Sequence, residues 1–76
     1  MKAKGQKYYI YGLKENKNKE YRVVYTETRY TLGSAIRKAQ RFFYQRDCDL
    51  VTVHNTTVHL LLNPVYVLER NVENVQ

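Results

Sequence analysis

One segment in the middle of the chain limits the fold more than any other. Six apolar residues fall on one helical face, at positions 32, 35, 36, 39, 42 and 43. Neighbours in this series are three or four residues apart, which predicts an amphipathic α-helix buried along one stripe. Thr31 precedes the series and suits the N-cap, where its hydroxyl can accept a hydrogen bond from a first-turn N–H. Such a helix needs an apolar surface to cover, and the rest of the chain must supply it.

Two segments before the helix have the composition of β-strands. Residues 8–13 and 20–28 are rich in Tyr, Val and Thr, and the segment 14–19 between them is polar. This pattern is typical of an antiparallel hairpin with a polar loop. Strand alternation would place residues 9, 11 and 13 on one face of the first strand, and residues 21, 23 and 25 on one face of the second.

A second hairpin is expected after the helix, over Leu50–Leu62, with its turn around residues 55–57. Alternation gives it a wholly apolar face, which includes Val51 and Val53 and should meet the helix. Its other face is mixed and carries His54, most simply as a solvent-side residue. Pro64 cannot donate to a strand ladder, so it ends this strand or marks an edge, and residues 65–68 could form a short fifth strand.

The predicted order is therefore β-β-α-β-β. The fold class is α+β, with an antiparallel sheet of four to five strands and one amphipathic helix on one face, because this arrangement buries all the apolar surfaces described. The 76 residues are short enough for a single domain, 1–76. We expect an ordered core over about residues 7–68 and a flexible tail over 69–76.

Charge is distributed unevenly along the chain. Residues 1–46 hold twelve of the thirteen Lys and Arg and three of the seven acidic residues, while residues 47–76 hold one Arg and four acids. The net charge of +6 thus divides into a basic half and a mildly acidic half. Such asymmetry suggests an anionic partner, either nucleic acid or an acidic protein surface. The alternative is that surplus Lys simply keeps a small domain in solution.

Motifs for catalysis are missing from the sequence. The three glycines are scattered and open no phosphate-binding loop. Ser34 lies in the first helical turn, where capping is its ordinary use, and Cys48 lies between Asp47 and Asp49, which should raise the pKa of a thiol. The two acids are better explained as turn formers at the helix-to-strand junction. We expect no enzyme and no catalytic residue.

Metal and cofactor sites are not indicated either. Cys48, His54 and His59 are separated by six and five residues, which matches no standard zinc spacing. The two His could still face each other across the second hairpin and bind a metal weakly or titrate together. We expect no metal ligands and no cofactor.

Two candidate partner-binding surfaces remain. The first is the polar face of the helix, with Arg37, Lys38, Arg41 and Tyr44. The second is the first hairpin, where tyrosines alternate with basic residues; its candidates are Lys7, Tyr9, Tyr11, Lys14 and Arg22. Each has an ordinary structural explanation, because basic residues solvate a helix face and tyrosines form good strands.

The composition resembles that of small proteins encoded by bacteriophages. The chain is short and rich in Lys, Asn and Tyr, and we expect it to form one helix on a small sheet without a catalytic constellation. Several phage anti-CRISPR and host-takeover proteins share this style, and they act by occupying a surface of a host machine. The resemblance covers the whole chain loosely and identifies no individual residue.

The leading hypothesis is a non-enzymatic protein-binding module, such as a phage-type inhibitor that docks on an acidic surface of a host nuclease, polymerase or chaperone–protease. The alternative is a DNA- or RNA-binding domain that uses the same Lys, Arg and Tyr surface. A homodimer is also possible, since short sheets leave exposed edges. The charged start of the chain suggests no secretory signal and no run reaches the ~18 apolar residues of a membrane span, so we expect a cytoplasmic protein with no membrane partner.

Overall fold

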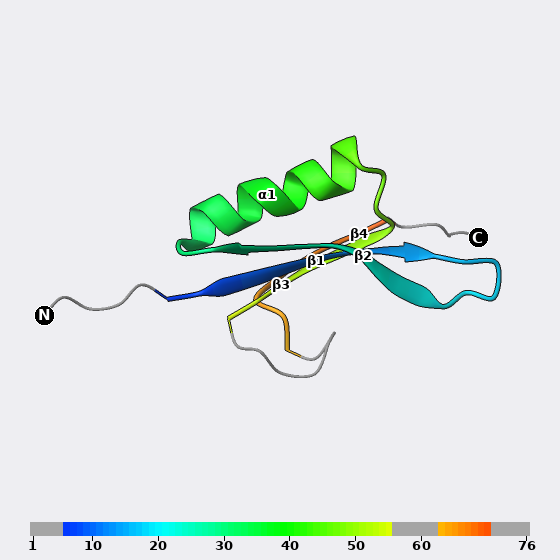
Figure 1. Cartoon of the computed structure of the whole chain (residues 1–76), viewed down its shortest axis with the longest axis horizontal. Helices are drawn as coiled ribbons and strands as arrows, with labels where there is room; N and C mark the ends of the chain where they lie inside the picture. Colours follow the sequence, from blue (N-terminus) through cyan, green and yellow to red (C-terminus); the bar gives the residue numbers. More distant parts are fainter. Residues whose placement is uncertain (1–5, 56–62, 71–76) are drawn as a thin grey trace, which may run out of the picture.

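The structure is a computed structural model that describes residues 6–55 and 63–70. Its elements in chain order are β1 (Tyr8–Glu15), β2 (Tyr21–Arg29), α1 (Leu32–Gln45), β3 (Leu50–His54) and β4 (Tyr66–Glu69). The four strands form one antiparallel sheet in the order β2-β1-β3-β4. Helix α1 lies across one face of this sheet (Figure 1). The predicted α+β class, with one helix on an antiparallel sheet, is confirmed.

The loop between β1 and β2 is closed by one asparagine. The side-chain oxygen of Asn16 accepts hydrogen bonds from the backbone N–H groups of Asn18 (2.8 Å) and Glu20 (3.1 Å). Lys19 adopts a positive φ of 66° in the same turn. Asn is favoured in turns because its side chain can replace a backbone partner in this way. The predicted antiparallel hairpin is thereby confirmed.

A β-bulge in β2 changes the predicted pattern of faces. Gly12 pairs with Tyr25, and the next residue of β1, Leu13, pairs with Val23. Val24 is therefore an extra residue in β2. Two residues that would share a face in a regular strand lie on opposite faces when one precedes Val24 and the other follows it. Tyr25 turns toward α1, whereas Val23 lies on the other face with Leu13. The prediction that residues 21, 23 and 25 share one face is wrong at position 25.

Helix α1 begins and ends with identifiable caps. The backbone N–H of Ser34 donates to the hydroxyl oxygen of Thr31 at 3.2 Å, which confirms Thr31 as the N-cap. At the other end, Asp47 has a φ of 56°, the left-handed conformation that commonly follows a helix, so its expected role as a turn former is confirmed. The first apolar residue of the stripe, Leu32, remains 41% exposed and lies outside the core.

The core lies between α1 and the sheet. Gly12 leaves no room for a side chain on this side of β1, because a Cβ added there would lie 2.8 Å from the sulfur of Cys48 and 3.3 Å from a ring carbon of Phe42. The ring of Tyr25 stacks on Phe42 with 5.3 Å between centroids. The buried residues that form the cluster are Ile10, Ala35, Ala39, Phe42, Cys48, Val51 and Val53. The predicted inward face of the strand after the helix is thus confirmed at positions 51 and 53.

The strand after the helix lies inside the sheet, where β1 and β4 flank it. The expected return strand up to residue 62 falls mostly in 56–62, outside the described residues, as does the expected place of His59. Residues 65–68, expected as an optional fifth strand, largely form β4. His54 is only 2% exposed, so the expectation of a solvent-side His54 is wrong. Its ring nitrogen Nε2 lies 3.0 Å from the hydroxyl of Thr52, and its ring contacts Tyr11 edge-on.

Contacts of the folded core continue beyond residue 68. Glu69 belongs to β4, and the backbone N–H of Arg70 donates to the carbonyl of Asp49 at 2.9 Å. The Arg70 guanidinium donates to the carbonyl of Cys48 (2.9 Å), pairs with the Asp49 carboxylate (3.4 Å) and covers the ring of Phe43. These contacts join β4 to the segment that follows the helix, so two residues assigned to the expected tail are part of the described fold.

Candidate functional site

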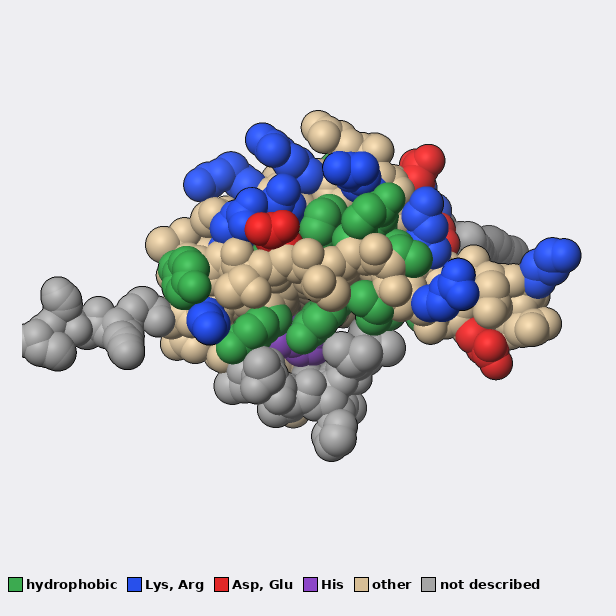
Figure 2. Space-filling model, viewed as in Figure 1, with side chains coloured by type: hydrophobic (Ala, Val, Ile, Leu, Met, Phe, Trp, Pro, Cys, Tyr) green, Lys and Arg blue, Asp and Glu red, His purple; other side chains and the backbone are tan. Residues whose placement is uncertain are grey.

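Basic side chains gather where α1 crosses the edge strand β2. Arg37, Lys38 and Arg41 of the helix and Arg29 of the strand surround a small surface depression of about 120 Å³, together with Ser34. Figure 2 shows Lys and Arg side chains gathered along the helix side of the molecule. We call these five residues the cationic depression.

Helical periodicity explains how the cationic depression forms. Its four helix residues follow the i, i+3, i+4, i+7 series, so they lie on one flank of α1. The buried Ala35 and Ala39 belong to the neighbouring, sheet-facing stripe of the helix. Arg29 is brought to this flank because it stands at the end of β2, only two residues before the N-cap Thr31.

Arg29 is held in place by its own strand. Its guanidinium donates to the carbonyl of Thr28 at 3.0 Å and forms an ion pair with Glu27. This residue was not among the candidates that the sequence suggested. Its distance of two residues from the predicted N-cap was the one signal that could have placed it beside the first helical turn.

The three helix cations differ from Arg29 in their pairing. Among the described residues, no carboxylate forms an ion pair with Arg37, Lys38 or Arg41. Lys38 instead lies over the ring of Phe42, with its nitrogen 5.7 Å from the centroid. The first turn of α1 also carries no acidic residue, so the positive end of the helix dipole is not offset there. The flank therefore presents a positive field to solvent.

A second depression adjoins the first on the outer face of α1. Arg37 and Arg41 line both, and the second is completed by Gln40, Tyr44 and Gln45. Tyr44 is 70% exposed, and its ring rests edge-on against Phe43 with 5.0 Å between centroids. The structure thus brings the four helix candidates together: Arg37, Lys38, Arg41 and Tyr44 lie on one continuous surface.

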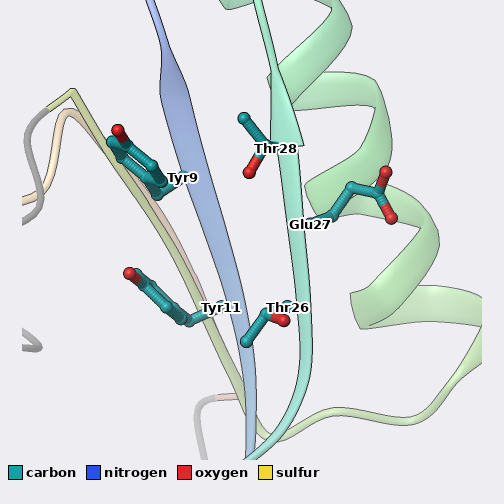
Figure 3. Close-up of a pocket in the computed structure, with 5 residues that line it drawn as sticks. All are labelled: Tyr9, Tyr11, Thr26, Glu27 and Thr28. Carbon is teal, nitrogen blue, oxygen red and sulfur yellow. The ribbon is translucent and has the colours of Figure 1, made fainter.

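The first-hairpin candidates are divided between the two faces of the sheet. Tyr9 and Tyr11 lie on the face opposite α1, beside Thr26 and Thr28 of β2 (Figure 3). In the same view Glu27 points the other way, toward the helix. These tyrosines and threonines border a wide, open depression of about 630 Å³.

Two basic members of that hairpin set, Lys14 and Arg22, lie apart from the tyrosines. Lys14 pairs with Arg22 across β1 and β2, toward the hairpin loop, and strand alternation puts Lys14 on the helix side with Gly12. Lys7 is exposed just before β1. The hairpin surface expected from the sequence, with tyrosines and cations interleaved, is therefore not a single surface.

Cys48 is a fully buried free thiol. Burial raises the pKa of the Cys48 thiol, and the neighbouring Asp49 and Asp47 raise it further, while Lys14 and Arg70 act in the opposite direction. The expected upward shift of its pKa has the right direction, although burial is the larger cause. In the part of the chain that the structure describes, no group of three or more His, Cys, Asp or Glu side chains is placed to hold a metal ion.

Comparisons of the chain with protein-family models, with curated proteins and with solved structures gave no significant match. Within residues 6–55 and 63–70, no helix is long and apolar enough to cross a bilayer.

Proposed function

We propose that this chain is a non-enzymatic binding module that docks the outer surface of α1 onto an acidic protein surface. The observation that carries the proposal is the set of helix cations, Arg37, Lys38 and Arg41, which no described carboxylate neutralises and which lie beside the exposed ring of Tyr44. Arg and Tyr are the side chains that most often dominate the affinity of protein interfaces.

The surface suits both steps of association. Several cations of one sign accelerate the encounter with an acidic partner and orient it, an effect that salt weakens. Tyr44 can bury a large ring with few rotatable bonds to immobilise, so it supports affinity once the surfaces meet. We expect Tyr44 and Arg41 to be the residues whose truncation costs most, each about 1–3 kcal/mol.

Nucleic acid is the second candidate, because Tyr9 and Tyr11 lie on the sheet face opposite α1 beside a depression, where aromatic rings could stack on bases. The arrangement of charges favours a protein. Base-stacking sheets need cations beside their rings to hold the phosphates, whereas Arg37 and Arg41 belong to α1, which covers the other face of the sheet (Figure 1).

The distribution of acids also favours a compact partner. Glu15, Asp49 and Glu69 lie close together beyond the helix C-terminus, because Asp49 accepts a hydrogen bond from the Glu15 N–H and Glu69 pairs with Leu50. A long polyanion that ran along α1 would meet these carboxylates and be repelled. An acidic patch on a protein can be small enough to contact the helix cations without reaching these carboxylates.

The biological context we propose follows from the resemblance to phage-encoded host-takeover proteins. In that setting the module would modulate or inhibit a host complex, such as a nuclease, polymerase or chaperone–protease, by occupying its acidic surface in the cytoplasm.

The test is affinity capture from a nuclease-treated lysate with the tagged chain and two charge-reversed variants. We expect the wild type and the control K17E/R22E to retain one stoichiometric partner, and R37E/R41E to lose it while its circular dichroism spectrum is unchanged. Equal losses in both variants would refute the helix surface. A partner that disappears on nuclease treatment, together with a gel shift that falls steeply with salt, would favour the nucleic-acid function.

A further inference from the structure

The cationic depression has the charge and size of a site for one anionic group. Its volume of about 120 Å³ leaves room for a compact anionic group such as a phosphoryl group. The hydroxyl of Ser34 adds a hydrogen-bond donor to the four cations. A Cβ on Gly33 would lie 3.8 Å from a terminal nitrogen of Arg37, so this guanidinium leans back over the first helical turn.

The four cations around this depression differ in whether a carboxylate already pairs with them. The guanidinium of Arg29 is already paired with Glu27, whereas Arg37, Lys38 and Arg41 are not paired with any described carboxylate. An occupant with one negative charge would leave most of this positive potential unbalanced. A dianion would balance more of it, and guanidinium groups bind the oxygens of phosphate in a planar, two-point geometry.

We propose that the cationic depression is a phosphomonoester site that takes a phosphorylated Ser or Thr side chain of the protein partner. The identity of the partner rests on the proposed function, but the preference for a phosphomonoester does not. A monoester carries about −1.5 to −2 charges at pH 7, whereas each phosphodiester of a nucleic acid carries one, so the depression should distinguish the two.

Replacement of Glu27 gives the most specific test of this geometry. Its carboxylate occupies one face of Arg29 and adds a negative charge beside the depression. Replacement with glutamine keeps the shape, releases Arg29 and removes that charge. The E27Q variant should therefore bind a phosphomonoester more tightly than the wild type does, which a general loss of structure could not mimic.

The experiment is an NMR titration of the purified, ¹⁵N-labelled full chain with phenyl phosphate at constant ionic strength, with diphenyl phosphate as the diester probe. We expect saturable shifts of the backbone amides of residues 33–38 with the monoester, and at least about five-fold weaker binding of the diester. Affinity for the monoester should fall as the pH drops below about 6, where the dianion gains a proton.

Two variants and a control complete the test. R37Q/R41Q should weaken monoester binding by about ten-fold or more, and E27Q should strengthen it by about three-fold. The control K17Q/K19Q removes the same charge from the exposed hairpin loop and should change affinity less than two-fold. Equal binding of both esters, shifts that do not saturate, or equal losses in R37Q/R41Q and the control would overturn the site.

The titration distinguishes failure of the phosphate site from failure of the proposed docking function. Saturable monoester binding without capture of a protein partner would leave the phosphate site standing and refute the docking function. Capture of a partner that R37E/R41E loses, without monoester binding in the titration, would leave the docking function standing and refute the phosphate site.

Discussion

Replacement of Gly12 by alanine tests the packing of the helix on the sheet. The new methyl group would lie 2.8 Å from the sulfur of Cys48, 3.3 Å from a ring carbon of Phe42 and 3.4 Å from the Cβ of Tyr25. Relaxed contacts between carbon atoms measure roughly 3.5–4.0 Å, so the methyl would be crowded by Cys48 and Phe42 and would touch Tyr25 at about the ordinary contact distance. The backbone itself presents no obstacle, because Gly12 does not have a positive φ.

The expected magnitude follows from two opposing effects. Overpacking of a tight core costs about 1–3 kcal/mol, and the loss of glycine's freedom in the unfolded chain returns about 0.4–1 kcal/mol. G12A should therefore lower the free energy of unfolding by about 0.5–2 kcal/mol. For a chain of this length the melting temperature would fall by about 3–15 °C.

A double-mutant cycle isolates the contact. C48A alone should destabilise the protein by about 1 kcal/mol, because it removes a buried sulfur atom. In the C48A background, however, the methyl of G12A enters the space that the sulfur left, so the second substitution should cost nothing or increase stability. Urea denaturation followed by circular dichroism measures all four proteins. Costs that add to within about 0.5 kcal/mol would refute the proposed contact between these two positions.

Three further predictions concern the caps, the C-terminal contacts and the buried thiol. T31A should lower the free energy of unfolding by about 1 kcal/mol in chemical denaturation because the first-turn N–H of Ser34 loses its acceptor, whereas T31S should be nearly neutral. R70A should lower it by about 1–2 kcal/mol, and R70K should not restore it fully, because Lys cannot reproduce the bonds to the Cys48 carbonyl and Asp49 together. The pKa of Cys48 is raised in the folded state, so the folded protein holds the thiol proton more firmly than the unfolded chain does. The free energy of unfolding should therefore fall as the pH rises above the ordinary thiol pKa of about 8.5. This fall should be smaller in C48A.

Each of these predictions has a result that contradicts it. Equal stabilities of T31A and T31S would exclude a role for the hydroxyl as a cap. An R70A variant as stable as the wild type would mean that β4 is not tied down by this side chain. A fall in stability above about pH 8.5 that is as large in C48A as in the wild type would contradict the raised pKa of Cys48.

The sequence predicted the features that depend on local pattern. Helix α1 and its cap at Thr31 follow from residue spacing, and the first hairpin follows from its polar loop around Asn16. The inward positions Val51 and Val53 also follow from simple alternation. In each case one short segment contains all the information, so no knowledge of distant partners is needed.

Features that depend on distant partners could not be predicted in this way. The bulge at Val24 arises where Gly12 of the neighbouring strand packs under α1, and nothing in residues 20–28 indicates it. The burial of His54 depends on side chains that are distant in sequence, among them Tyr11 of β1, whose ring contacts the His54 ring edge-on.

The candidate surfaces likewise divide into a part that local sequence pattern predicts and a part that depends on distant residues. The four helix candidates lie together because one helix face joins them. The hairpin candidates separated because Tyr9 and Tyr11 point to one side of the sheet and Lys14 lies on the other. Arg29 joined the cationic depression only through the turn that connects β2 to α1, a proximity that strand periodicity alone does not reveal.

Arginine footprinting of the captured complex tests the central claim most directly. An arginine-selective dicarbonyl reagent is applied to the free chain and to the complex, and the modified residues are quantified by mass spectrometry. Arg37 and Arg41 are exposed and should react in the free chain but be protected in the complex, while Arg22, also exposed, should react equally in both. Protection of Arg22 with unchanged reaction at Arg37 and Arg41 would contradict docking through the outer surface of α1.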